Sequence, residues 1–573
     1  CNLLLQKAPL IASEQDRNSA LGEAYFLRGY NYYRLFCQYE RCPLQLEPID
    51  VSAGVPRNFK LSSGEDVLNQ VIDDLQKAYD LLRTDDWRGA GTWTKYTAAH
   101  FLAKALLYRQ SERCTWKSNY PAKTDLDRAI RLCDEVIDAR GLEKDYNNLY
   151  SNWTGVDCNI EKSKEILMSA LHNDASTTVG RYGNRTYNYF SSQYNTYSGG
   201  YVPRGQYIGD MEFQRCRPTE YTYAVFDNVN DSRMWKTFKT VYGICNNVAT
   251  PDYVKAENAP TFGDQGVLFL LNKKDDTRFR KDEFGRAAIK HTFVNPETGK
   301  WVPNVAPVYA EGQYVMNTYG TSAANRSNMF CGINKTADGS RTGEKGDAHR
   351  DVTMARVGET YLVKAECQVR NGDDAGALAT INLLRKRAEW KAGEDCEYYV
   401  DGTIAFKSNS TASGNCAKGN KDANGAKLTN QQAFEYSFIQ KNSYVLSTGV
   451  ERPVESESWN ASSLQISSWN NLPAEDQAVL NGMGLSVNTL EGKVNFILNE
   501  RTRELLGEWN RWDELSRTKT LYKRAKLFNP ETLYIQEHHN LRPIPQSFLD
   551  GLTNDNGEPL TDQEKKDMQN PGY

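Results

Sequence analysis

Residues 500–517 read ERTRELLGEWNRWDELSR, a segment in which opposite charges recur three positions apart. Side chains at this spacing share one face of an α-helix, where they can form ion pairs. Apolar periodicity around the segment predicts a continuous helix from Val494 to Thr520. We interpret the charges as structural rather than catalytic. The pairs at this spacing are Glu500 with Arg503, Arg501 with Glu504, and Glu508 with Arg511.

Further amphipathic helices are predicted toward the N-terminus, where apolar residues recur every three or four positions. The helix pairs span about 34 to 41 residues, a repeat typical of tetratricopeptide-like units, which stack into a solenoid. Residues 371–373, Asn-Gly-Asp, end one helix and cap the next. The predicted helices run from Leu21 to Tyr39, from Gly64 to Leu82, from Lys95 to Arg109, from Leu126 to Ile137 after a turn at Pro121, from Met354 to Arg370 and from Ala375 to Ala388.

Other segments have the composition of loops. Residues 139–350 are rich in Tyr, Asn, Gly and Thr, with short β-like runs such as Val267 to Leu271. The stretches from Gly402 to Lys427 and from Asn442 to Ser486 are rich in Ser, Asn and Gly, which predicts long surface loops. We predict one mainly α-helical domain with a large loop-rich insertion. Its parts are a tether at 1–20, helix pairs at 21–138, a loop-rich region at 139–350, a helical hairpin at 351–390, surface loops at 391–490 and a C-terminal helix with terminal motifs at 491–573.

Charge and hydropathy exclude two classes of protein. The 573 residues include 69 Lys and Arg against 73 Asp and Glu, a formal net charge of −4. This balance supplies no basic field to hold nucleic acid or an anionic membrane. The sequence also has no run of 18 or more apolar residues, so we expect no helix that spans a bilayer.

Cysteine usage points to processing at the first residue. Translation cannot start at Cys1, so this residue indicates a removed leader and predicts a bacterial lipoprotein whose terminal thiol and amine are acylated. The plainer alternative is an arbitrary sequence boundary. Acylation would leave 11 of the 12 cysteines, an odd number, so at least one stays unpaired. Cys396 and Cys416 flank a loop and could pair, and no two cysteines form a C-x-x-C pair, so a structural metal held by cysteines is not expected.

Motifs for catalysis are absent from the sequence. It contains no H-E-x-x-H, no phosphate-binding G-x-x-x-x-G-K-[ST] and no G-x-S-x-G nucleophile elbow. We therefore do not expect an enzyme. A glycosidase stays open as a competing hypothesis, because its carboxylate pair is defined by separation in space.

Aromatic residues are abundant in polar surroundings. Seven tyrosines fall between Arg181 and Tyr207, among Asn, Ser, Gly and Arg. An aromatic ring offers a flat apolar face to a sugar, while neighbouring polar side chains can bond the sugar hydroxyls. This pattern favours binding of a neutral sugar. The alternative is that the tyrosines pack a loop-rich region and satisfy loop backbone.

Several segments together resemble the SusD/RagB family, the surface glycan-binding lipoproteins of Bacteroidetes. The match at 500–517 is the most specific, and the matches keep their order along the whole chain. The loops from Gly402 to Lys427 and from Asn442 to Ser486 look like insertions, which leaves ligand choice and partner contacts open. The other matching segments are GEAYFLRGYNYYRLF at 22–36 with Cys42-Pro43-Leu44, RPTEY at 217–221 with Phe226 to Arg233, the hairpin at 351–388, Pro543-Ile544-Pro545, and QNPGY at 569–573.

The resemblance implies a scaffold of four tetratricopeptide-like units, braced by the charges at 500–517, that carries a loop-rich ligand-binding region. It implies a surface-exposed lipoprotein of the outer membrane that caps a SusC-like TonB-dependent transporter and delivers oligosaccharide to it. No cofactor is expected. Because some relatives carry a structural calcium, Asp227 to Asp231 and Asp275-Asp276 could supply oxygen ligands, but no spaced loop motif assigns them, and solvated turns are the plainer interpretation.

Trp87, in the loop at 85–91, is the first-choice ligand residue, because relatives carry ligand-stacking aromatics at this place. We expect Trp87 to stack on a sugar while Asp86 and Arg88 bond its hydroxyls. Trp301 and Tyr314 are second choices. Competing hypotheses are a relative that feeds oligopeptides to its transporter and a tetratricopeptide scaffold that binds only proteins.

Overall fold

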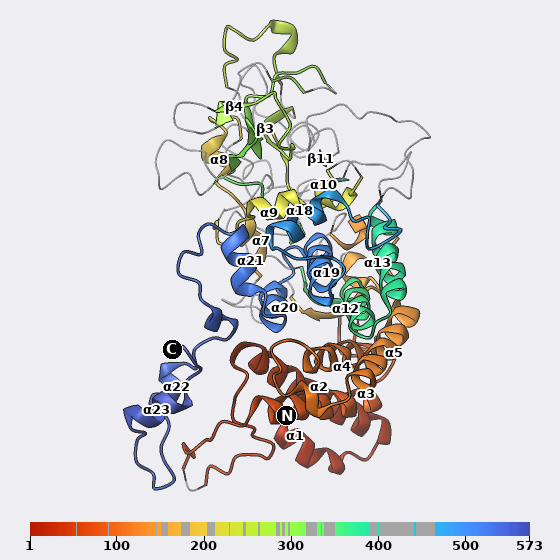
Figure 1. The fold of residues 1–573 in the computed structure, drawn as a ribbon, viewed down its shortest axis with the longest axis vertical. Helices are drawn as coiled ribbons and strands as arrows, with labels where there is room; N and C mark the ends of the chain where they lie inside the picture. Colours follow the sequence, from red (N-terminus) through yellow and green to blue (C-terminus); the bar gives the residue numbers. More distant parts are fainter. Residues whose placement is uncertain are drawn as a thin grey trace.

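The computed structural model is an elongated molecule with helices at one end and short strands at the other (Figure 1). Both termini lie in the half that holds the first helices (Figure 1). The structure describes residues 1–573 except 53, 90, 145, 151–158, 173–183, 203–212, 229, 245–247, 262–263, 282–286, 289–292, 296–297, 317–328, 334, 337–349, 390–397, 400–440 and 443–463.

The N-terminal helices confirm the amphipathic periodicity. Ser63 and Thr94 cap two of them through their side-chain oxygens. The first helix pair begins at Glu14 rather than Leu21, and short helices precede it, so the segment expected to be a tether is helical. The elements are α1 (Asn2–Lys7), η1 (Ala8–Leu10), α2 (Glu14–Tyr39), α3 (Gly64–Leu81), α4 (Lys95–Arg109), η2 (Lys117–Asn119), α5 (Ala122–Arg140), η3 (Tyr146–Leu149) and η4 (Asn159–Lys162).

The central hairpin consists of α12 (Val357–Arg370) and α13 (Asp374–Ala388), with Asp373 as the N-cap of α13. The prediction that its first helix starts at Met354 is wrong. Met354 lies in β9 (Val352–Arg356), which pairs antiparallel with β1 (Ile166–Ala170). Tertiary pairing thus holds the backbone extended up to Arg356, the N-cap of α12. Apolar side chains of α2 to α5, α12, α13 and the C-terminal helices form one core.

The middle of the chain builds a second core from short elements. Its sheet has the order β2-β3-β6, in which β3 pairs antiparallel with β2 and parallel with β6. This confirms irregular structure with small strands. The elements are α7 (Thr186–Phe190), α8 (Tyr194–Tyr197), α9 (Glu220–Ala224), α10 (Ser232–Thr237), β2 (Val241–Gly243), η6 (Ala256–Asn258), β3 (Gln265–Leu270), β4 (Arg280–Lys281), β5 (Ala287–Ala288), β6 (Asn304–Pro307), β7 (Tyr309–Ala310), β8 (Gln313–Tyr314), β10 (Tyr398–Tyr399) and β11 (Lys441–Asn442).

The C-terminal part corrects two predictions. The expected helix from Val494 to Thr520 is two helices, α19 and α20, because the chain turns at Gly507 and Trp509, whose φ angles are positive. Within the expected loop at 442–486, residues 464–472 supply buried side chains and α18 follows. The stretch from Gly402 to Lys427 lies outside the described residues. The elements are α18 (Ala474–Gly482), α19 (Leu490–Leu505), α20 (Arg511–Arg517), α21 (Leu521–Phe528), η8 (Glu537–Asn540), α22 (Gln546–Asp550) and α23 (Asp562–Met568).

Charges of the 500–517 segment are buried and pair mostly between elements. The expected pair of Glu500 with Arg503 is present at 2.8 Å. The other two expected pairs do not form, because tertiary partners lie closer. Arg501 pairs with Glu359 and Glu514, Glu504 with Arg233, Arg356 and Arg387, and Glu508 with Arg356 and Lys335.

Free thiols occur at several described cysteines. Cys37, Cys133 and Cys367 are buried in the helical core, whereas Cys1 is exposed. Cys396 and Cys416 lie outside the described residues.

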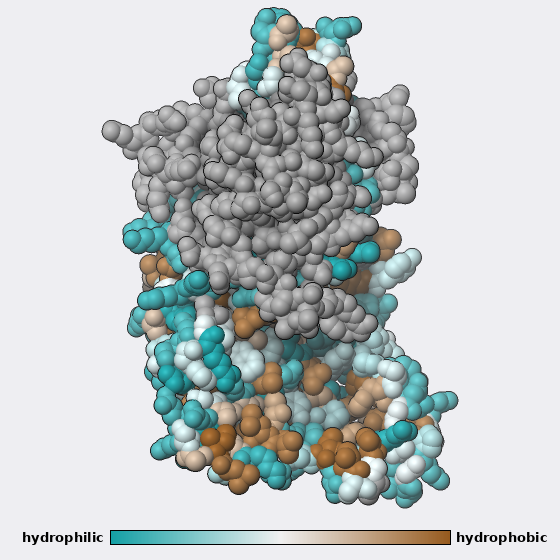
Figure 2. Space-filling model, turned by 180° about the vertical axis from the view of Figure 1, so that it is seen from behind, coloured by the Kyte–Doolittle hydropathy of each residue, from teal (hydrophilic) through white to brown (hydrophobic). Residues whose placement is uncertain are grey.

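The described helices include none with the length and apolar character needed to cross a membrane. Seen from behind, apolar side chains gather at several places on the half that holds the N-terminal helices (Figure 2). Exposed apolar residues of this half include Leu3, Leu4 and Leu10, and Ile49, Val51 and Val55 of the segment between α2 and α3.

Candidate functional site

Trp87 lies in the turn between α3 and α4 with 44% of its surface exposed. The loop is fixed to β1, because the Ser169 backbone N–H donates to the Gly91 carbonyl at 2.9 Å. Gly91 has a φ of +79°, and a Cβ there would lie 2.7 Å from the Ser169 hydroxyl. Only glycine suits both the backbone conformation and this close approach. The loop therefore presents an exposed indole from a fixed position.

Charged side chains surround the Trp87 ring. The guanidinium carbons of Arg88 and Arg83 lie 4.3 and 5.3 Å from the ring centroid. Arg88 also pairs with Glu23 at 2.8 Å, and its side chain is half exposed. Asp86 accepts two hydrogen bonds from Nη1 of Arg140, at 3.0 and 2.9 Å. Because a carboxylate has about four acceptor sites, Asp86 keeps capacity for a ligand hydroxyl.

Trp301 does not offer a binding platform. Its indole is 4% exposed and packs in the second core, edge-on to Tyr201 and Tyr253. The expectation that Trp301 stacks on a ligand is therefore corrected: the ring serves the packing of the sheet region. Of the tyrosines between 181 and 207, Tyr187, Tyr194 and Tyr201 are likewise buried, whereas Tyr189 is exposed. Tyr182 and Tyr207 lie outside the described residues.

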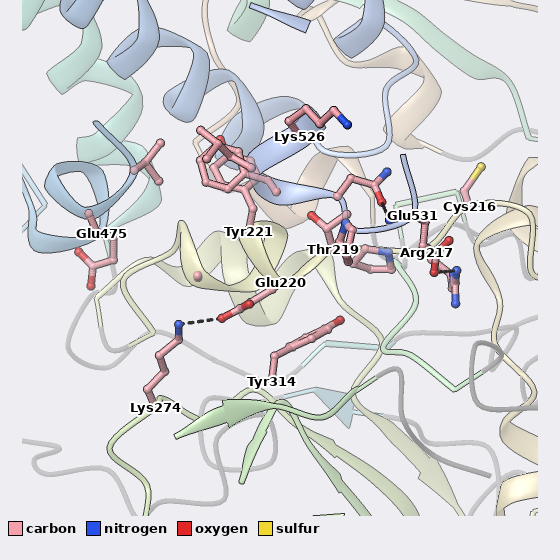
Figure 3. A pocket seen from close by; sticks show the side chains of 18 of the residues that line it. Cys216, Arg217, Thr219, Glu220, Tyr221, Lys274, Tyr314, Glu475, Lys526 and Glu531 are labelled. Atoms are coloured by element: carbon pink, nitrogen blue, oxygen red, sulfur yellow. Dashed lines mark hydrogen bonds and ion pairs between the residues drawn. The ribbon is translucent and has the colours of Figure 1, made fainter. Parts of the chain in front are cut away.

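Tyr314 lines a polar cavity of about 880 Å³ between α9, α18, α21 and β8 (Figure 3). Its hydroxyl is buried and has no partner among the described residues. Two ion pairs lie in the wall: Lys274 lies 2.8 Å from Glu220, and Arg217 contacts Glu531. The cavity is large enough for a small organic ligand, and its wall carries charges of both signs.

A second, apolar cavity of about 640 Å³ adjoins the first. Both cavities are lined by Cys216, Thr219, Tyr221, Phe528 and Asn529. Tyr221 and Phe528 stack on each other, with centroids 4.8 Å apart. The apolar cavity extends under the turn that separates α19 from α20, and its wall includes Leu505, Leu506, Trp509, Trp512, Leu515 and Leu521.

Metal ligation has little support in the described residues, where no group of three or more His, Cys, Asp or Glu side chains is arranged to hold an ion. Of the candidate calcium ligands, Asp276 pairs with Arg278 at 2.7 Å, and Asp227 accepts hydrogen bonds from Asn230. A structural calcium stays a prediction.

Two protein-family models match the sequence. The model of the SusD family matches residues 134–424, more than half of the chain. The chain belongs to the SusD family. A second model, described as starch-binding and associating with the outer membrane, matches residues 2–107. SusD family membership supports carbohydrate binding and outer-membrane association, and SusD-like proteins are binding proteins rather than enzymes. No curated protein matches this sequence.

Solved structures of SusD-like proteins share the fold. A SusD-like protein from Bacteroides fragilis is 14% identical, with 100% of this chain and 83% of that chain covered and a TM-score of 0.51. A SusD homolog from Bacteroides thetaiotaomicron is 15% identical, with coverage of 98% and 80% and a TM-score of 0.51. NanU of Bacteroides fragilis is 15% identical, with coverage of 100% and 81% and a TM-score of 0.50. At this identity, the likeness shows the SusD fold alone.

The two cavities were missed by sequence reasoning, although two SusD family motifs line them. Residues 217–221 border the polar cavity, and much of 501–515 borders the apolar one. The charges at 500–517 predict ion pairs within a helix and so indicate scaffold, and the sequence assigns no separate role to residues 217–221. The signal that could have found the cavities is the pair Trp509 and Trp512, large rings in a charged segment.

Proposed function

We propose that the protein captures oligosaccharide at the cell surface and delivers it to a SusC-like TonB-dependent transporter of the outer membrane. The observation that carries this proposal is Trp87, an exposed indole on a loop that β1 holds in place. Membership of the SusD family, and the starch-binding description that matches residues 2–107, support a carbohydrate as the ligand. Binding and transfer of this kind need no cofactor.

The surroundings of Trp87 suit reversible binding. A sugar that stacks on the ring must displace Arg88 or Arg83, whose side chains are 53% and 31% exposed. Surface ion pairs such as Arg88 with Glu23 contribute only about 0.2–1 kcal/mol, so moving the Arg88 side chain away from the ring costs little free energy. Stacked aromatic pairs contribute about 0.5–1.5 kcal/mol beyond buried area, and we expect a contribution of this order from a sugar on the Trp87 indole. A receptor that must release its ligand to a transporter needs such modest contacts.

Replacement of Trp87 tests the ligand site. Trp87→Ala should weaken binding in glycan affinity gels by about three- to tenfold, because the stacking contribution is lost. Its melting temperature should stay close to that of the wild type, since the ring is exposed. Tyr534→Ala is a matched control, because Tyr534 is an 86% exposed aromatic outside both cavities. Unchanged retardation of Trp87→Ala would contradict the assignment, and retention by peptides instead of glycans would favour the oligopeptide receptor.

The cellular part of the proposal concerns anchoring and the transporter. We propose that Cys1, an exposed free thiol in the structure, carries the lipid. Leu3 and Leu4, close to Cys1 in sequence, are also exposed and apolar. Cys1→Ser should move the protein from the outer-membrane fraction to the soluble fraction, and the wild type should co-purify with a TonB-dependent transporter. Membrane retention of Cys1→Ser, with the transporter absent from the purified complex, would contradict this part.

A further inference from the structure

Three arginines line the apolar cavity, and two of them lack a carboxylate partner. Arg511 donates to the Leu498 carbonyl at 2.7 Å and lies 3.4 Å from the Tyr221 hydroxyl. Arg524 donates from Nη2 to the Asn495 backbone carbonyl at 2.8 Å and to the Asn499 side-chain oxygen at 3.1 Å. Its Nε donates to the Asn495 side-chain oxygen at 3.0 Å, and its Nη1 reaches the Tyr221 hydroxyl at 3.3 Å. One of its five N–H donors, on Nη1, is therefore left for a ligand among the described contacts. Within the described part of the chain, no Asp or Glu lies within ion-pair distance of Arg511 or Arg524.

The third arginine, Arg501, is buried and only partly satisfied. Its Nη2 pairs with Glu359 at 2.7 Å and Glu514 at 3.0 Å. Its Nε and Nη1 are buried and have no hydrogen-bond partner in the described structure. A buried donor without a partner costs about 1–3 kcal/mol, so a ligand that accepts these hydrogen bonds would recover that cost.

The local balance of charge at the cavity is positive. Two carboxylates also border it, but Glu508 is held by Arg356 and Lys335, and Glu514 by Arg501 and Arg517. Burial, together with the neighbouring cations Arg524 and Arg501, lowers the pKa of Arg511 to about 10 against the opposing effect of Tyr221. Cations that destabilise one another in this way are stabilised by an incoming anion.

Aromatic walls stand beside these cations. Trp509 is 48% exposed and lies against Phe190, with ring centroids 5.4 Å apart. The cavity also shares Tyr221 and Phe528 with the polar cavity of about 880 Å³. The lining of the apolar cavity therefore combines aromatic rings with guanidinium donors, and its volume of about 640 Å³ lies in the range of small-molecule sites.

We propose that this cleft binds a carboxylate-bearing sugar unit of a glycan, with its carboxylate on Arg511 and Arg524 and its ring face on Trp509. Guanidinium groups suit carboxylates because their planar donors match the two oxygens. The apolar walls select an organic acid over a free inorganic anion. This inference rests on the proposed glycan-binding function and narrows its ligand to acidic glycans, at a cleft whose lining residues do not include Trp87.

The probes for a test are a tetramer of galacturonic acid and 3′-sialyllactose, each compared with its methyl ester by calorimetry on the full chain. At least one acid should bind the wild type at least about tenfold more tightly than its ester, because charge-assisted hydrogen bonds are lost on esterification. The preference should shrink at high salt. It should fall at least about tenfold in Arg511→Gln and survive in part in Arg511→Lys, which keeps the charge.

Lys523→Gln is the matched control, because Lys523 is an exposed cation on α21 outside both cavities. It should keep the preference, and circular dichroism should show that the Arg511 variants are folded. If Arg511→Gln is unfolded, Trp509→Ala must weaken the acid and its ester alike. Equal binding of acids and esters would overturn the inference while the glycan-binding function stands. Binding of neutral glycans alone would likewise overturn the inference and leave the glycan-binding function standing. Binding of no glycan would overturn the inference and the proposed function together. Displacement by peptides with a free C-terminal carboxylate, but not by sugar acids, would also overturn the inference.

Discussion

Glu366 shows how the buried ion-pair network shifts the pKa of a single side chain. Glu366 is fully buried and contacts Arg517 at 2.6 Å and Arg370 at 2.8 Å. Burial alone would raise the pKa of Glu366, but the two arginines outweigh it and lower the pKa from 4.5 to about 2. A carboxylate whose pKa is lower in the folded state stabilises the protein above its unfolded pKa. This contribution is lost as the pH falls through the folded value.

Glu366→Ala should lower the free energy of unfolding at pH 7 by about 3–5 kcal/mol, because it leaves a buried charge without its partner. The difference from the wild type should be constant above pH 5 and shrink between about pH 4.5 and 2, as the wild-type carboxylate becomes protonated. Urea unfolding across this pH range measures it. Asp555→Ala, which removes a solvated pair with Lys60, should leave stability unchanged. A difference that persists at pH 2 would contradict the assignment.

At the scale of elements, the loop between α3 and α4 shows how a strand positions the Trp87 side chain. Gly89 and Gly91 both have positive φ angles, but only a Cβ on Gly91 would meet another side chain, that of Ser169 on β1. An alanine at residue 89 would therefore strain only the backbone, whereas an alanine at residue 91 would also push the loop away from β1.

Gly91→Ala should weaken glycan binding about as much as Trp87→Ala, although residue 91 has no side chain that could contact a ligand. It should also lower stability by about 1–3 kcal/mol, the usual cost of a strained conformation. Gly89→Ala should lower stability through backbone strain but leave glycan binding unchanged. Affinity gels with thermal melts of both variants test this, and equal loss of binding in both would show that displacement of the loop is not the cause.

For the whole molecule, buried charge joins the helical core to the sheet region. Arg233 of α10 contacts Glu500 and Glu504 of α19, each at 2.9 Å, and all three side chains are inaccessible to solvent. Residues more than 260 positions apart therefore connect the two cores. The connection depends on both halves being folded.

Arg233→Ala should loosen the sheet region more than the helical core, because Glu500 keeps Arg385 and Arg503 as partners within the helical side. Hydrogen exchange should accelerate in β3 and change little in α4. Arg280→Gln, which removes a solvated contact with Glu311, is the control and should change neither. Equal acceleration in β3 and α4 would indicate global destabilisation instead.

The sequence by itself determined the family and several helix boundaries, because capping residues and apolar periodicity act over a few neighbouring positions. It predicted Lys95–Arg109 and the Asp373 cap as observed. Only the tertiary structure decided which charges pair, since Arg356 and Glu508 lie far apart in sequence and compete with helical neighbours. It also decided that Trp301 is core while Trp87 is exposed, and that Arg511 faces a cavity. Burial and cavity walls depend on contacts between distant segments, which no local pattern encodes.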